Sequence, residues 1–242
     1  AAPPVKWALL AFGAAALQGQ VIRWAWQHRV HHRHSDERAD PHNRRQGFWH
    51  AHMGWIFLKT PEFYAAAKVE QANLDDLLND PALRLQHRLW LPVGLALSFG
   101  MPALFGRWLG GQSWTCFLVA GAARHFFHWH CTMFVNSWAH SPHAGPDAKP
   151  YGARGLAVEN FVVNLLSCGQ GSHDWHHKFA HDYMSSEHGW WRWYNPAGFF
   201  IDAMAALGLA SGRKRALSMW QHSSTIDARR GPPPQHSPSK RD

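Results

Sequence analysis

The chain has 242 residues, of which 46% are hydrophobic, and its formal net charge is +8. This length and apolar content suit one large domain, and three cysteines without a CxxC pair argue against a disulfide framework or a cysteine zinc site. The basic residues lie in loops beside apolar segments and in the C-terminal tail, which favours a positive cytoplasmic membrane face over a nucleic-acid surface.

The first half of the chain predicts helices separated by one polar loop. Residues 1–27 are apolar and Ala-rich, so we expect a helix that leads directly into a histidine cluster. Residues 33–47 form a polar loop, and a charged helical stretch runs from Pro61 to about residue 88.

Two apolar segments, 89–110 and 114–135, are each long enough to cross a bilayer. The connector Gly110–Gly111–Gln112 is so short that it predicts an antiparallel hairpin of helices. Several of the 15 tryptophans flank these segments, as in the aromatic belt of a membrane protein. The second segment carries polar residues, for which we expect packing or polar contacts; they are Arg124, His125, His128 and His130.

The last third of the chain begins with a Pro/Gly-rich loop after His140, which runs to a helix expected to end at a second histidine cluster. Residues 196–210 predict a last apolar helix with Pro in its first turn. Residues 223–242 are rich in Ser, Pro and basic residues and predict disorder. No strand pattern stands out, so we predict an all-α chain with one domain, 1–222, and a disordered tail, 223–242.

A repeated HxxHH pattern carries the chemistry. Histidines at i, i+3 and i+4 share one face of a helix, so each copy directs imidazoles to one point. Two such faces offer six nitrogen ligands, too many for one tetrahedral zinc and suited to a pair of iron ions. The simpler alternative is a solvated helix end rich in histidine. The six residues are His28, His31, His32, His173, His176 and His177.

Four blocks of sequence, in order, resemble the membrane-bound acyl-CoA Δ9 (stearoyl-CoA) desaturases. They are HRVHHRHSDERADPHNRRQGFWHAHMGW (28–55), VNSWAH (135–140), GSHDWHHKFAHDY (171–183) and FFIDAMAALGLASGRKR (199–215). The resemblance covers most of residues 5–220.

The resemblance implies an integral membrane helical fold with a cytosolic, histidine-rich di-metal domain. It implies a multi-pass enzyme of the endoplasmic reticulum whose active site faces the cytosol. Two Fe²⁺ ions and O₂ would insert a cis double bond into a saturated acyl-CoA. Cytochrome b5 and its NADH-dependent reductase would supply electrons, membrane lipid would surround the chain, and nucleic acid would have no role.

The resemblance also assigns residues. The six HxxHH histidines and His140 match metal ligands, and Asn136 matches a residue that holds a metal-bound water. The i, i+4 spacing of Asn136 and His140 predicts that both lie on one helical face. Three residues match those that bend the family's substrate tunnel beside the metals: Gln18, Trp24 and Thr132.

The chain also departs from the family pattern. The family's HxxxxH box precedes its first HxxHH, but none of the 27 residues before His28 is histidine. We therefore expect two spanning helices of the family's four, an interfacial helix over 5–22, and weak or incomplete metal binding. Smaller departures bear on the acyl-CoA contacts and on chain length: Trp26 replaces an Arg, Met133 a Trp and Gln170 a Glu.

Other interpretations stay open. The chain could be another membrane di-iron lipid oxidase, such as a hydroxylase or a desaturase of another acyl carrier, because both reactions begin with the same hydrogen abstraction. It could be a non-catalytic paralogue or fragment, since the HxxxxH box is absent. A soluble zinc enzyme is a weaker option. We expect four further histidines to be loop residues or to support the ligands: His34, His42, His50 and His52.

Overall fold

The computed structural model describes residues 1–71 and 73–221, so the predicted disordered tail, 223–242, lies outside the described residues. Within them the chain is helical, and its only β pairing consists of two isolated bridges, His140 with Ala157 and Glu159 with Ser172. This confirms the all-α prediction for the described part.

The first helices are α1 (Pro3–Ala15), α2 (Val21–Arg33), η1 (Arg44–Gln46), α3 (Phe48–His52), η2 (Gly54–Ile56), α4 (Pro61–Gln71) and α5 (Asp75–Leu78). The remainder are α6 (Pro81–Leu95), η3 (Ala96–Gly100), α7 (Met101–Trp108), α8 (Ser113–Cys116), η4 (Phe117–Ala123), α9 (Arg124–Ser137), η5 (Pro146–Ala148), α10 (Phe161–Leu166), α11 (His173–Lys178) and α12 (Pro196–Ala206).

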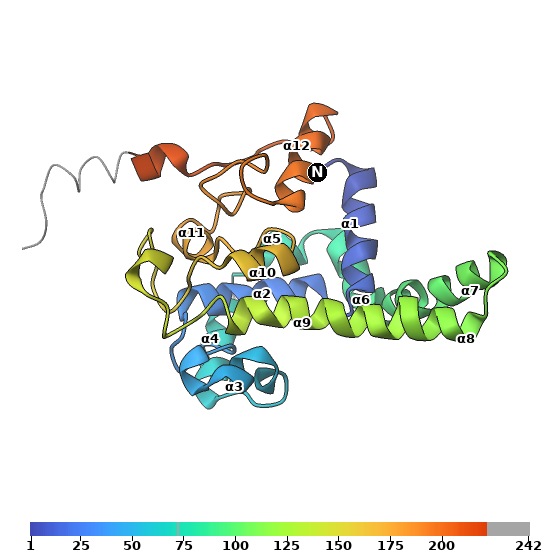
Figure 1. The fold of residues 1–242 in the computed structure, drawn as a ribbon, viewed down its shortest axis with the longest axis horizontal. Helices are drawn as coiled ribbons and strands as arrows, with labels where there is room; N and C mark the ends of the chain where they lie inside the picture. The colour runs from blue at the N-terminus through green and yellow to red at the C-terminus, as the bar shows by residue number, and fades with distance from the viewer. Residues whose placement is uncertain (72, 222–242) are drawn as a thin grey trace, which may run out of the picture.

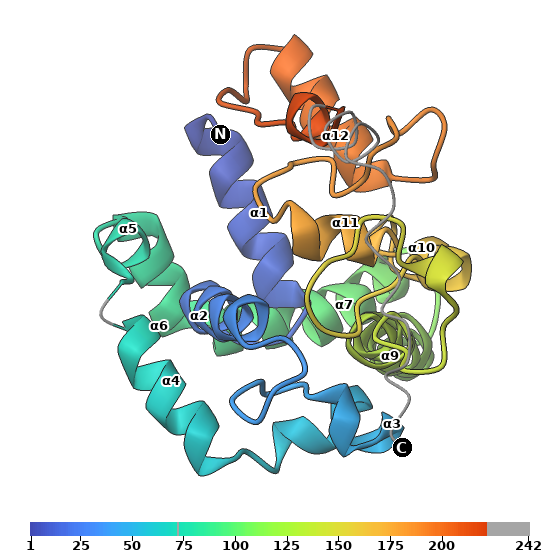
Figure 2. The ribbon, with the colours of Figure 1, turned by 90° about the vertical axis from the view of Figure 1, so that its left-hand side faces the viewer.

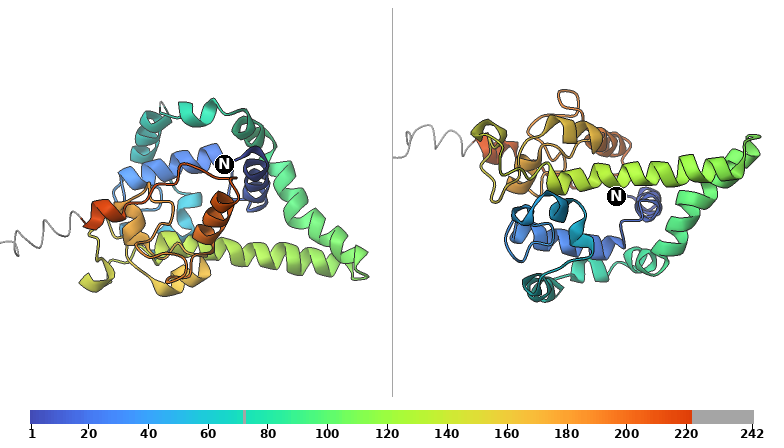
Figure 3. Two further views of the ribbon diagram at one scale, coloured as in Figure 1. Left: turned by 90° about the horizontal axis from the view of Figure 1, so that it is seen from above. Right: turned by 60° about the horizontal axis from the view of Figure 1, so that its bottom comes forward.

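The predicted helical hairpin is present. α6, η3 and α7 form one continuous helix, and α8, η4 and α9 form a second that returns antiparallel to it (Figure 1). The two touch near the turn, where Gly106 meets Cys116, and diverge away from it (Figure 3). The first of them, Pro81–Trp108, is the described helix whose length and composition would allow it to cross a membrane.

The expected single helix over residues 1–27 is wrong, because the chain turns sharply between α1 and α2. Leu17 and Gly19 adopt positive φ angles of 51° and 103°, which end α1 and redirect the chain into α2. The turn is held by hydrogen bonds from Trp129 Nε1 to Ala16 O (3.1 Å) and from Ser98 Oγ to Ala15 O. We call residues 16–20 the elbow. It lies against both diverging arms of the hairpin.

The histidine-bearing elements gather at the open end of the hairpin. α2 packs on α4 through Val30, Phe63 and Ala67, while α3 packs on α9. In the view along the hairpin, α2, α9 and α11 surround one central region (Figure 2). The second HxxHH does not end a longer helix, as the sequence suggested, but forms the short helix α11.

Candidate metal centre

The seven predicted histidine ligands converge into two adjacent clusters. One cluster holds His31, His140, His173 and His177, and we call it the four-histidine site. The other holds His28, His32 and His176, and we call it the three-histidine site. Each site takes nitrogens from both α2 and α11, so neither HxxHH motif makes a site alone.

The nitrogen spacings fit metal ligation. In the three-histidine site, Nε2 of His32 lies 3.0 Å from Nε2 of both His28 and His176, which are 3.4 Å from each other. Three mutually close Nε2 atoms cannot all be joined by hydrogen bonds, because each ring nitrogen of a neutral imidazole is either a donor or an acceptor and not both. Imidazole nitrogens bind divalent metals at about 2.1 Å, so two nitrogens on one ion lie roughly 3 Å apart. The triangle therefore suits a shared cation.

The four-histidine site has the same spacing. Nε2 of His173 lies 3.0 Å from Nε2 of His140 and 3.1 Å from that of His177, and His177 lies 3.3 Å from His31. All four nitrogens fall within 4.8 Å of one another. The chain thus presents two potential metal positions beside each other, with four and three histidine ligands among the described residues.

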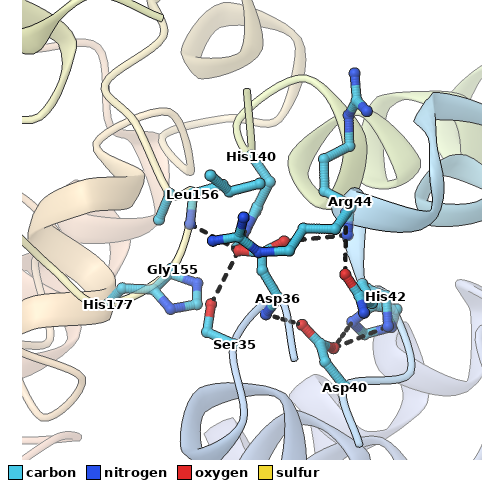
Figure 4. A network of polar contacts seen from close by, with 12 residues as sticks. Ser35, Asp36, Asp40, His42, Arg44, His140, Gly155, Leu156 and His177 are labelled. Atoms are coloured by element: carbon cyan, nitrogen blue, oxygen red, sulfur yellow. Dashed lines mark hydrogen bonds and ion pairs between the residues drawn. The ribbon is translucent and has the colours of Figure 1, made fainter. Parts of the chain in front are cut away.

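Two buried carboxylates orient ligands of the four-histidine site (Figure 4). His31 Nδ1 donates to Asp40 Oδ1 and His140 Nδ1 donates to Asp36 Oδ2, each at 2.8 Å. A proton on Nδ1 leaves Nε2 with a lone pair for a metal, as in carboxylate–histidine–metal arrangements. Burial opposes ionisation of Asp36, but His140 and backbone N–H donors hold its pKa below the ordinary value.

Most of the ligands are held neutral, as metal binding requires. Burial lowers the pKa of His32 to about 2 and that of His176 to about 4, and neighbouring histidines act in the same direction. Burial also places the pKa of His28, His173 and His177 well below the ordinary value. These imidazoles carry free lone pairs at neutral pH.

The predicted placement of Asn136 and His140 on one helical face is wrong. α9 ends at Ser137, so His140 lies beyond the helix, in a bridge with Ala157. Its ring reaches the metal ligands because Asp36 holds it, not because of helical periodicity. Asn136 instead lines a cavity next to the histidines.

That cavity has a volume of about 530 Å³ and is bounded by ligands of both metal positions. The three residues expected to bend a substrate tunnel all line it: Gln18, Trp24 and Thr132. Gln18 Nε2 donates to Thr132 Oγ1 at 2.8 Å, which fixes the elbow against α9 at the cavity wall. The cavity therefore connects the metal positions with the elbow.

Two cations also line the cavity, Arg23 at the start of α2 and Lys59. Neither forms an ion pair among the described residues, and burial, with Arg23 nearby, lowers the pKa of Lys59. The ammonium of Lys59 lies 5.4 Å from the ring centre of Trp55. Two uncompensated positive charges favour an anionic group at this part of the cavity.

Comparison with known proteins shows which enzymes the chain is similar to. No protein-family model matches the chain. It is 36% identical over 214 residues to stearoyl-CoA desaturase 5 of Bos taurus and 37% identical over 219 residues to the Δ9-fatty-acid desaturase fat-6 of Caenorhabditis elegans, covering 88% and 89% of this chain. It is 34% identical over 208 residues, 86% of this chain, to an acyl-CoA Δ11 desaturase of Trichoplusia ni. Over 86–89% of its length the chain is therefore similar to acyl-CoA desaturases. The matches span 62%, 62% and 58% of the length of these relatives.

Some residues around the histidine sites could not be recognised from the sequence. Asp36 and Asp40 were not singled out, although carboxylates shortly after an HxxHH motif are plausible partners for its histidines. Arg23 and Lys59 are cations without a motif, and only the fold brings them to the cavity. Gln170 and Met133, two departures from the family pattern, line the cavity, whereas Trp26 packs away from it and donates to Ala67 O.

Among the described residues, the other histidines lie outside the two sites, although His42 forms a third close group with His31 and Asp40. His42 is buried beside His31, with ring centres 5.0 Å apart, and lines the cavity. His52 bonds to Ser137 Oγ and to His130, which links α3 to α9. His128 contacts Gln18 at 3.2 Å, a polar contact of the kind expected for that segment. His34 pairs with Glu37.

Proposed function

We propose that the chain is the metal-binding part of an acyl-CoA Δ9-type desaturase, which inserts a cis double bond into a saturated acyl-CoA with O₂ as co-substrate. The observation that carries the proposal is that seven histidine nitrogens form two adjacent sites, and that histidines of both sites line one cavity. The family relationship supports a fatty acyl substrate, since the relatives include Δ9 and Δ11 desaturases.

The seven histidines would hold two iron ions, and Asn136 would hold a metal-bound water. Nitrogen ligands fit this role because they withstand an oxidising metal centre where thiolates would be oxidised. When bound, the irons would activate O₂, which is the oxidant that removal of hydrogen from an unactivated C–H bond requires. The protein contributes position and exclusion of water, which are its usual roles around a redox cofactor.

The cavity explains how one carbon would be selected. Arg23 and Lys59 would bind the phosphates of the coenzyme A head group, which fixes one end of the substrate. Gln18, Trp24 and Thr132 would set the path of the acyl chain past the histidines. The distance between the cationic and metal positions then determines which carbon faces the metals. Because Trp26 stands where the family has an arginine, Arg23 would supply the positive charge that Trp26 lacks.

We place the hairpin in the endoplasmic reticulum membrane, with the metal centre on the cytosolic side. Supporting this, α6–α7 has the length and composition of a spanning helix, and Leu104 and Trp108 on it are 73% and 77% exposed. The second long helix, with its apolar exposed side chains Val119 and Phe126, would be the second span. Cytochrome b5 and its NADH-dependent reductase would deliver the electrons.

A second candidate is a metal-binding family member without desaturase activity. It is favoured by the three-histidine site, which has one histidine fewer than its neighbour among the described residues. The same experiment separates the two candidates, because it measures both bound metal and product.

The test uses membranes containing the protein, supplied with deuterated stearoyl-CoA, NADH, cytochrome b5, its reductase and O₂. A desaturase removes two hydrogen atoms from the acyl chain, or two deuterium atoms where the reacting carbons carry the label, so the product is lighter by that mass. A hydroxylase instead yields a product heavier by one oxygen atom. We expect the desaturated product and two iron positions per chain, with the iron at the three-histidine site held more weakly because that site has fewer histidines. His176→Ala removes a nitrogen of the three-histidine site and should abolish conversion.

His181→Ala is the matched control, because His181 is exposed and lies only five residues beyond His176. It should retain wild-type conversion. Undiminished conversion by His176→Ala would contradict the site assignment. Bound iron without any product would favour the second candidate.

A further inference from the structure

Lys149 lies in an unusual cage of oxygen atoms. Its ammonium donates to the backbone carbonyls of Ala153 (3.0 Å), Gly155 (3.3 Å) and Ala157 (2.7 Å). It also pairs with Asp174 Oδ1 at 3.3 Å. A charged group with four partners, whose side chain is only 27% exposed, holds the intervening loop in one conformation. We call residues 149–157 the clamp loop.

The far end of the clamp loop touches the support of a metal ligand. Leu156 N donates to Asp36 Oδ2 at 2.7 Å, and the same oxygen accepts from His140 Nδ1 (Figure 4). Gly155 packs so closely that an added Cβ would lie 2.5 Å from Ser35 Oγ and 2.8 Å from Asp36 Oδ2. The position of this loop therefore fixes Asp36, and Asp36 fixes the His140 ring.

The near end of the clamp loop is anchored on α11. Asp174 is fully buried and follows His173 directly, and its carboxylate accepts hydrogen bonds from the backbone N–H groups of Tyr151 (2.8 Å) and Ala153 (2.9 Å). Lys149 neutralises this buried carboxylate. Without the ammonium, the carboxylate would remain buried without a cation, and three carbonyls would lose a donor.

We propose that Lys149 is a positioning residue for the four-histidine site. Through Asp174 and the clamp loop it joins the helix of His173 to the carboxylate that orients His140. The effect should be selective, because the three-histidine site has no contact with Asp36 and α11 keeps other supports, such as Glu159 bonded to Trp175 N at 3.1 Å. The inference rests on the proposed two-metal function.

The experiment titrates metal-free protein in detergent with Co²⁺ and follows the visible absorption of the bound ion together with the number of ions retained. The wild type should bind two ions per chain. In Lys149→Met we expect one ion to bind as before and the other to bind about 10- to 100-fold more weakly, the usual effect of losing a group that supports a ligand. Lys149→Arg should restore most of the affinity because it restores the charge.

Lys68→Met is the matched control, since it removes an exposed lysine of α4, a helix that contributes no residue to either histidine site or to the clamp loop. It should bind two ions normally. If Lys149→Met does not fold, Gly155→Ala displaces Asp36 from the same loop and should give the same selective loss.

The inference would be overturned if Lys149→Met bound both Co²⁺ ions with wild-type affinity, or if it bound both more weakly by the same factor. Either result would leave the two-metal centre in place. A wild-type protein that binds no Co²⁺ would overturn the proposed function and this inference together.

Discussion

Glu159 is a partly buried acid that lies close to the histidine sites without touching one of their histidines. Its Oε1 accepts a hydrogen bond from Trp175 N at the start of α11. Burial raises the pKa of Glu159 to about 7, and the nearby Asp174 acts in the same direction against the lowering effect of its hydrogen bonds. Between the ordinary pKa of a glutamate and 7, the folded protein therefore holds a proton that the unfolded chain has released.

This difference predicts how stability depends on pH. Since the folded state binds the extra proton, the free energy of unfolding falls as pH rises from about 4.5 to about 7 and is constant above that for this group. Glu159→Gln keeps an oxygen that can accept from Trp175 N but cannot ionise. The variant should gain roughly 1 to 3 kcal/mol relative to wild type between pH 5 and pH 8. Denaturation at a series of pH values checks this, and a difference independent of pH would contradict it.

At the residue scale, the clustered histidines could be predicted but their grouping could not. A helical face and a family pattern both select the six histidines of the HxxHH motifs, whereas the family pattern alone selects His140. Their division into four and three depends on how α2 meets α11 in space, which spacing within either motif does not contain. Asp36 was missed because its position depends on a loop conformation with φ of 60°.

At the scale of elements, the elbow between α1 and α2 decides the shape of the cavity. On one side of the elbow, Ser98 binds the preceding Ala15 O, and on the other side Trp129 and Thr132 bond to the elbow itself, so it is held between the two arms of the hairpin. α1 lies directly on α6, where Gly94 leaves room for the backbone of Ala14. Close contact between α1 and α6 thus fixes the elbow that walls the cavity.

Gly94→Ala tests this contact. A Cβ on Gly94 would lie 2.5 Å from Ala14 O, a backbone atom that cannot move without displacing α1. We expect a loss of about 1 to 3 kcal/mol in the free energy of unfolding, the usual effect of overpacking. Gly100→Ala is the matched control in the same long helix, since no other group lies within 4 Å of its added Cβ. Thermal unfolding in detergent compares the two, and equal midpoints would contradict the proposed packing.

The hairpin was predictable and the elbow was not. Two long apolar segments joined by Gly110–Gly111–Gln112 have few alternatives to an antiparallel pair. Residues 1–27, in contrast, are largely apolar, with most of their alanines before residue 17, and local propensity favours one continuous helix. The chain bends at Leu17 and Gly19 because tertiary hydrogen bonds from Trp129 and Ser98 satisfy the carbonyl groups that the broken helix leaves.

At the scale of the whole molecule, the polar and apolar parts are separated in space. The histidine sites, their carboxylates and the clamp loop lie at one end, and the hairpin projects from them with its tip far from the metal ligands (Figures 1 and 3). Large apolar side chains cover the tip, including Leu104, Trp108 and Trp114. A projecting apolar hairpin without a protein partner in the described structure suits a bilayer, and the metal centre would then lie at its surface.

Leu104→Arg tests the placement of the hairpin in the membrane. Leu104 is 73% exposed and lies in the apolar part of α7, so an arginine there would face hydrocarbon at a cost of up to about 3 kcal/mol. The fraction of protein that resists extraction from membranes by carbonate should therefore fall. Val69→Arg adds the same charge at a 60% exposed apolar position on α4, away from the hairpin, and should leave that fraction unchanged. Equal extraction of both variants would mean that the hairpin does not face lipid, and its apolar surface would then require a protein partner instead.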